Sequence, residues 1–217
     1  MNNQKLDGLI EKGYDFDIRE GFEQGWLMYK KYPAYATGYT FFVISLQLLF
    51  ALYLPDYAVL FGVFLAGPLS AGYYLAANKI SQGEPLLYPD FFKGFEYYVP
   101  LVLVTVIGQV LTVIGLFVLI IPGIYLLVAY LFSSLMVLFG GFEFWNALEY
   151  SRKVIQVQWI KFLLFGVFAV LLNIVGAMLL LVGLAVTLPV TYFALYHIFE
   201  SITRDVFVEE AEGIKAV

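Results

Sequence analysis

The chain of 217 residues contains no cysteine and one histidine. Disulfides, thiolate metal sites and cysteine nucleophiles are therefore excluded, as is a metal site built from several histidines. Charge is also scarce, since Asp, Glu, Lys and Arg make up 13% of the residues and the net charge is −5. Nucleic-acid binding needs a basic surface that neutralises phosphates, so we expect no nucleic-acid partner.

Apolar residues dominate instead. They form 62% of the chain, and the mean hydropathy of +0.84 lies outside the range of soluble domains. No charged residue occurs between Glu96 and Glu143. One helix over that stretch would be roughly 70 Å long, more than twice the ~30 Å hydrocarbon layer of a bilayer. The stretch must fold back, and Pro122-Gly123 is the predicted turn because proline is tolerated in a first helical turn.

Four charge-poor blocks predict an all-α, polytopic membrane protein with six transmembrane helices arranged as three hairpins. Each hairpin is expected to follow a cytoplasmic, amphipathic helix that lies in the membrane interface. The predicted spans are 34–54, 58–80, 98–118, 122–140, 159–181 and 184–204. All 12 Lys and Arg residues fall on one side of these spans, whereas the three opposite turns carry only Asp56. The positive-inside rule then places both termini and the two long loops in the cytoplasm.

The chain is expected to form one membrane domain, 34–206, between a cytoplasmic N-terminal segment, 1–33, and a cytoplasmic tail, 207–217. Residues 1–13 are polar and are expected to be loosely ordered. The mixed charges of the first 31 residues are not those of a cleaved signal peptide.

An amphipathic helix is predicted from Asp15 to Lys31. Its apolar residues recur at helical spacing, and aromatic and basic residues crowd its end. The apolar positions are Ile18, Phe22, Trp26 and Tyr29. This composition is typical of a helix lying in the membrane interface. An ordinary soluble helix is the alternative interpretation.

Three segments, 17–23, 90–96 and 143–149, share the order acid, apolar, two variable, small, apolar, Glu. The leading acid is expected to cap a helix N-terminus, and the small residue to let that helix approach a transmembrane neighbour. The second helix of each predicted hairpin also carries a proline. These turn or kink residues are Pro68, Pro122 with Gly123, and Pro189. The pattern predicts a threefold internal repeat, with coincidence of common residue types as the alternative.

Several short motifs carry a resemblance to a known group. They are Gly67-Pro-Leu-Ser-Ala-Gly-Tyr-Tyr74, Gly83-Glu-Pro85, Asp90-Phe-Phe-Lys-Gly-Phe95, Ile121-Pro-Gly-Ile-Tyr125 and Ala147-Leu-Glu-Tyr-Ser-Arg-Lys-Val154. Over residues 34–202 the chain resembles the membrane domain of some bacterial glycerophosphodiester phosphodiesterases and related stand-alone six-helix inner-membrane proteins. The resemblance implies a multi-pass fold in the bacterial cytoplasmic (inner) membrane. It does not imply hydrolase activity, because this sequence lacks the catalytic barrel and its metal-binding residues.

Polar residues within the predicted spans are the candidate site residues. One amide falls near the middle of the first helix of each hairpin: Gln47, Gln109 and Asn173. They predict either interhelical hydrogen bonds that fix the register of the bundle or a central polar site for a substrate or lipid headgroup. A second candidate is His197, Glu200 and Arg204 on one helix face, which could handle a proton or bind a headgroup. The alternative for His197 is an ordinary helix-end residue.

No catalytic carboxylate pair, activated nucleophile or phosphate-binding glycine loop is found, and no cofactor is expected. The sequence therefore favours a non-enzymatic integral membrane protein with a structural, accessory or lipid-interacting role. Its expected partners are membrane lipids and other membrane proteins in a complex. The alternatives are a small transporter or channel for a lipid-like or apolar solute and, less favoured, a membrane-bound enzyme of lipid metabolism.

Overall fold

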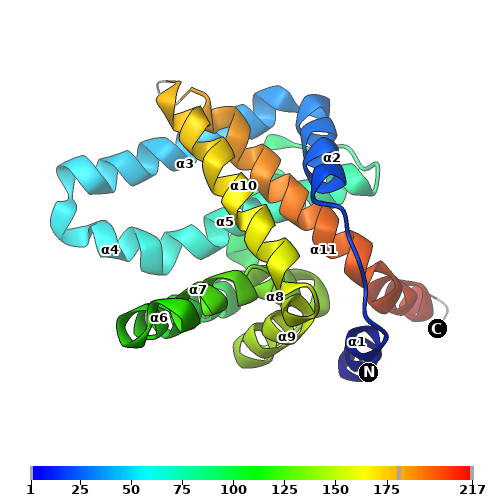
Figure 1. Ribbon diagram of the computed structural model, residues 1–217. Coiled ribbons are helices and arrows are strands. Elements are labelled where there is room, and N and C mark those ends of the chain that lie inside the picture. Colours follow the sequence, from blue (N-terminus) through cyan, green and yellow to red (C-terminus); the bar gives the residue numbers. More distant parts are fainter. Residues whose placement is uncertain (1, 180–181, 216–217) are drawn as a thin grey trace.

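The computed structural model describes residues 2–179 and 182–215, and the described residues form helices and no strand (Figure 1). The α-helices are α1 (Asn2–Lys12), α2 (Ile18–Lys31), α3 (Pro33–Tyr53), α4 (Ala58–Leu60), α5 (Ala66–Ser81), α6 (Tyr98–Val118), α7 (Ile120–Ala129), α8 (Ser133–Gly140), α9 (Phe144–Val157), α10 (Trp159–Met178) and α11 (Leu184–Lys215). Two 3₁₀ segments, η1 (Pro55–Tyr57) and η3 (Tyr88–Tyr97), and a π-helical segment, η2 (Phe61–Leu65), complete them.

Five stretches of helix are long and apolar enough to cross a membrane, which marks the chain as a membrane protein. They are Pro33–Tyr53, Pro55–Ser81, Tyr88–Val118, Ile120–Gly140 and Trp159–Met178. Their positions agree with the first five predicted spans. The sixth predicted span lies within α11, which is helical but is not one of the five. Residues 180–181, at the end of the fifth predicted span, lie outside the described part of the chain.

The N-terminal segment is more ordered than expected. Residues 2–12 form α1, and the side chain of Leu6 is completely buried. The helix packs against α9 and α11. The expectation of a loosely ordered segment is wrong because its apolar residues pack: Leu6 lies in the core, and Leu9 and Ile10 pack against it.

The predicted amphipathic helix is α2, and it packs along α11 through glycines. A methyl group added at Gly25 would lie 2.7 Å from the carbonyl oxygen of Val190, and one at Gly21 would lie 2.8 Å from Ile198. Gly21 and Gly25 are one helical turn apart, so α11 packs on a stripe of α2 without side chains, with its backbone at Gly25 and its Ile198 side chain at Gly21. Trp26, predicted to lie on the apolar face, is 44% exposed.

Two further helical segments flank the apolar helices in the same manner. Segment η3 packs along α5, where a methyl group at Gly94 would collide with the carbonyl oxygen of Pro68. Helix α9 packs against α6, α7 and α8, and its Ala147 is fully buried. The small residue of each predicted segment therefore lies in a tight contact, as expected.

The predicted caps hold only in part. The Asp17 carboxylate accepts the Arg19 N–H at 2.8 Å and caps α2. Asp90 lies inside η3 and reaches back to accept the N–H of Leu87 at 2.8 Å, while it pairs with Lys79 of α5 at 2.9 Å. Glu143 occupies the N-cap of α9, but its side chain makes no capping bond.

The fold-back in the uncharged stretch occurs at Leu119, three residues before the predicted position. Leu119 is extended, with φ −155° and ψ 135°, between α6 and α7. Pro122 falls in the first turn of α7, where no intrahelical N–H partner is lost. Pro68 lies in the first turn of α5, and Pro189 lies inside α11.

A glycine substitution tests the backbone contact between η3 and α5. We expect Gly94→Ala to lower the stability by about 1–3 kcal/mol, because the added methyl group has no space beside Pro68. Gly166→Ala is the matched control, since nothing lies within 4 Å of the position of its methyl group. Thermal unfolding in mild detergent should separate the two variants. Equal stability of both would contradict the close approach of η3 to α5.

Candidate functional site

The structure does not form a central site from the three predicted amides. Gln47 and Gln109 lie on exposed faces of α3 and α6, and neither side chain forms a hydrogen bond within the described part of the chain. Hydropathy gives no indication of which face of an apolar helix turns inward, and these two amides do not form the predicted interhelical hydrogen bonds among the described residues. Asn173 is the only one of the three that joins two helices.

Asn173 belongs to a small polar group between α10 and α11. Its amide nitrogen donates to the hydroxyl of Thr191 at 3.0 Å and to the carbonyl of Ala169 at 2.8 Å. The Asn173 carbonyl oxygen and the Thr187 hydroxyl are buried and have no hydrogen-bond partner. Asn173 therefore acts as an interhelical hydrogen-bonding residue.

The predicted helix-end cluster is also dispersed. Glu200 accepts from the Ser81 hydroxyl of α5 at 2.6 Å, and Asn78 of α5 donates to Tyr196 of α11 at 2.8 Å. Arg204 is exposed, and among the described residues neither it nor His197 shares an ion pair or hydrogen bond with Glu200. These polar side chains fix α5 to α11, and they do not form a proton-handling triad.

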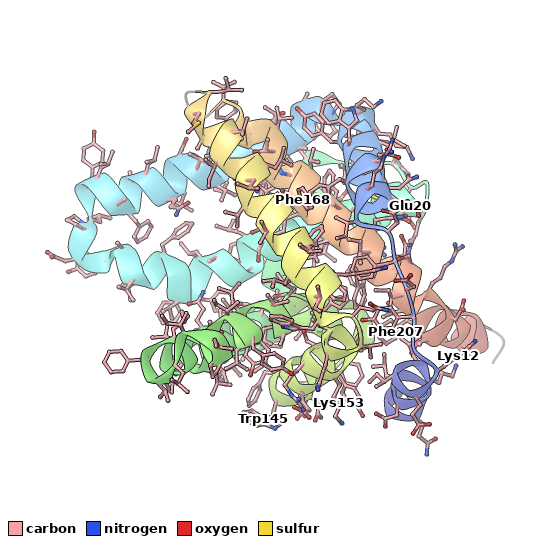
Figure 2. The ribbon with its side chains drawn as sticks, viewed as in Figure 1. Lys12, Glu20, Trp145, Lys153, Phe168 and Phe207 are labelled. Atoms are coloured by element: carbon pink, nitrogen blue, oxygen red, sulfur yellow. The ribbon has the colours of Figure 1, made fainter. Side chains whose placement is uncertain are left out.

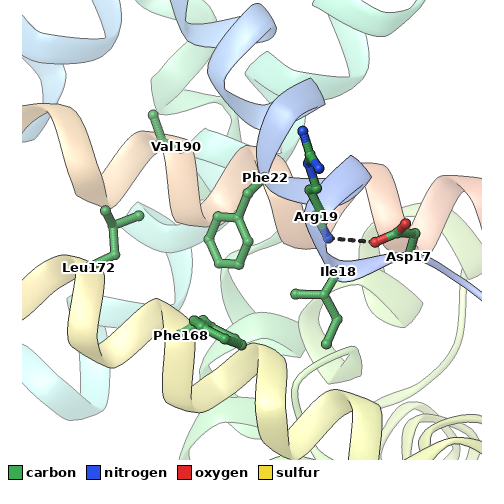
Figure 3. A pocket seen from close by; sticks show the side chains of 7 residues that line it. All are labelled: Asp17, Ile18, Arg19, Phe22, Phe168, Leu172 and Val190. Carbon is green, nitrogen blue, oxygen red and sulfur yellow. Dashed lines mark hydrogen bonds between the residues drawn. The ribbon is translucent and has the colours of Figure 1, made fainter.

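A groove that the sequence did not indicate opens between α2 and α10 (Figure 3). Ile18 and Phe22 form one wall, Phe168 and Leu172 the other, and Val190 of α11 the floor. Its volume is about 580 Å³, within the usual range for sites that hold a small organic ligand. Among the described residues that line it, the charged ones are Asp17 and Arg19, at the N-terminal end of α2. The groove thus has an apolar body and a charged mouth.

A second hollow adjoins the first, because Asp17 and Ile18 line both. Phe16 and Leu164 contribute apolar surface, and an ion pair between Asp15 and Lys161 lies at its rim. The hydrogen bond from Lys161, together with the Phe16 N–H, lowers the pKa of Asp15. Arg19 is likewise paired, with its Nε 2.7 Å from the Glu23 carboxylate. The mouth therefore carries charges of both signs on the same short stretch of chain.

The groove exists because α2 rests on α11 and leaves a space beside α10. Phe22 stacks on Phe165 at the base, with ring centroids 5.0 Å apart. The space between η3 and α3, by contrast, is filled by aromatic rings. Tyr39 lies 4.7 Å from Phe91, and Phe42 lies 5.4 Å from Phe92. Only the glycines of α2 could have pointed to this region from the sequence, since a Gly-x-x-x-Gly stripe signals close helix packing.

Among the described residues, no group of three or more His, Asp or Glu side chains could hold a metal ion. Comparison with protein families, curated proteins and solved structures finds no match to this chain.

Two threonines test the polar contact between α10 and α11. Thr191→Val removes the acceptor of Asn173 and should lower the stability by about 0.6–2 kcal/mol, the range measured for such bonds in membranes. Thr187→Val is the matched control, because it removes a buried hydroxyl that has no partner and should be neutral or stabilising. Unfolding midpoints in mild detergent would measure both. A loss confined to Thr187→Val would contradict the assigned bonding.

Proposed function

We propose that the chain is a non-enzymatic integral membrane protein that binds a membrane lipid in the groove between α2 and α10. The observation that carries the proposal is the combination of an apolar body with a mouth charged in both signs. An acyl chain matches the walls formed by Phe22, Phe168 and Leu172, because removing apolar surface from water lowers the free energy. A phospholipid headgroup matches the charged end.

The proposed topology has six spans in three hairpins, with α11 as the sixth span and both termini in the cytoplasm of a bacterial cell. The location of the Lys and Arg residues supports this orientation. The contacts support a repeat of three units in a closed order: η3 packs on α5 of the preceding unit, α9 on α7 and α8, and α2 on α11.

This topology places the groove at the level of the cytoplasmic headgroups. Helix α2 ends in Lys30 and Lys31, and Lys30 lies over the Trp26 ring with its ammonium 5.9 Å from the centroid. Exposed tryptophan and lysine are the residues that anchor a helix at the boundary between headgroups and acyl chains. A lipid of that leaflet can therefore enter the groove without leaving the membrane.

Both hollows share Asp17 and Ile18 and so adjoin each other at the N-terminal end of α2.

A substitution that fills the groove tests this function. Leu172→Trp should reduce the amount of phospholipid that stays bound through purification in mild detergent, because the indole occupies the space of the acyl chain. Leu171→Trp is the matched control, since Leu171 is exposed on α10 and does not line the groove. Native mass spectrometry would count the retained lipids. Equal retention by both variants and the unaltered protein would contradict the proposal.

A further inference from the structure

The turn between α6 and α7 bears an exposed apolar surface, here named the apolar tip: Phe117, Val118, Leu119, Ile120 and Ile121. Phe117 is 94% exposed and Ile121 is 81% exposed. No polar side chain occurs from Gly115 to Ile124. A turn that emerges into water usually carries polar residues, so this composition calls for an apolar environment.

The outward direction of these side chains follows from how closely α6 and α7 approach each other. A methyl group at Gly115 would lie 3.1 Å from the Cα of Gly123, and one at Gly123 would lie 2.5 Å from the backbone nitrogen of Leu116. No space remains between the two helices for the side chains of the turn. The apolar tip therefore faces outward and continues the exposed apolar surface of the two helices, which includes Val113 and Leu127.

Part of the backbone of the turn is paired internally. The N–H of Leu119 donates to Gly115 at 3.0 Å, and that of Gly123 donates to Leu119 at 3.4 Å. Pro122 has no N–H. Because the first N–H groups of a helix are normally left without partners, these features reduce the cost of placing the start of α7 in an apolar medium.

The length of α6 limits how far the tip can reach. Its 21 residues span roughly 30 Å, about the thickness of the hydrocarbon layer, only if the helix stands upright. Figure 1 shows α3, α6 and α10 running in different directions, so they cannot all stand upright. Tilt shortens the reach across the membrane. Lys12 and Glu20, which are labelled in Figure 2, lie toward the opposite end of the molecule from this turn.

The turn between α3 and α4 provides an internal contrast. It carries the exposed Asp56, flanked by Tyr53 and Tyr57, which are also exposed. Tyrosine favours the membrane–water interface, and a carboxylate needs water. The turn at Asp56 thus has the composition of a hairpin end that reaches the far aqueous side.

We infer that the apolar tip ends inside the far leaflet, among its acyl chains, and does not emerge into water, whereas the turn at Asp56 does emerge. The tip is thus a lipid-contacting surface distinct from the groove. Its occupant is the acyl region of the leaflet opposite the one that contains α2.

Single cysteines test this inference cleanly, because the chain has none of its own. The variants are Val118→Cys in the tip, Asp56→Cys in the other turn and Lys12→Cys at the N-terminal end. A membrane-impermeant maleimide is applied to right-side-out and to inside-out vesicles of the host membrane. Asp56→Cys should react from one side and Lys12→Cys from the other. Val118→Cys should react at least about tenfold more slowly from both sides, because the reactive thiolate needs water. Reaction of Val118→Cys from either side as fast as its control would overturn the inference.

A second measurement separates burial in lipid from cover by another protein. A spin label at Val118→Cys is followed in purified protein reconstituted in vesicles of phosphatidylethanolamine and phosphatidylglycerol. Frequent collisions with oxygen and few with a water-soluble nickel chelate would support contact with acyl chains. Few collisions with either reagent would mean that protein covers the tip, and this would overturn the inference. Because Leu172 plays no part in this measurement, its outcome is independent of lipid binding in the groove.

Discussion

The architecture depends on two places where the backbones of neighbouring helices approach closely: the contact of α2 with α11 and the contact of η3 with α5. At Gly25 and Gly94 the neighbouring backbone occupies the space that a side chain would need. Apolar burial gives little preference for one helix partner in a membrane, because lipid tails are as apolar as leucine. Shape at these glycines therefore selects α11 as the partner of α2 and α5 as the partner of η3. The hydrogen bonds of Asp90 and Asn173 then hold segments already brought together.

The groove follows from the same constraint. Gly21 and Gly25 fix the position of α2 on α11. In that position α2 is separated from α10 by the groove. Between η3 and α3, aromatic side chains leave no such groove and pack against each other. Phe22 and Phe168 instead form the walls of an open hollow. Close helix packing is thus accompanied by a filled interface between η3 and α3 and by an open groove between α2 and α10.

Much of the helix pattern was predictable from the sequence, because long apolar runs fix where spans begin and end. The predicted span 98–118 coincides with α6. The fold-back was misplaced by three residues because Pro122 is compatible with the first turn of a helix as well as with the turn before it. The partners of Gln47 and Gln109 could not be predicted, since an apolar helix does not encode which face turns inward. The groove could not be predicted either, because it depends on residues from α2, α10 and α11 that meet only in the folded chain.

The contact between α2 and α11 has a consequence for how the protein is made. Gly25 lies against Val190 of α11. This contact partner of α2 is therefore synthesised 190 − 25 = 165 residues after Gly25. At about 5–20 residues per second, α2 waits on the order of ten to thirty seconds on the ribosome-bound chain. During that interval α2 can contact α3, α5 and α10, but it lacks the helix along which it packs most extensively. The glycine contact that fixes α2 can therefore form only after α11 has been made.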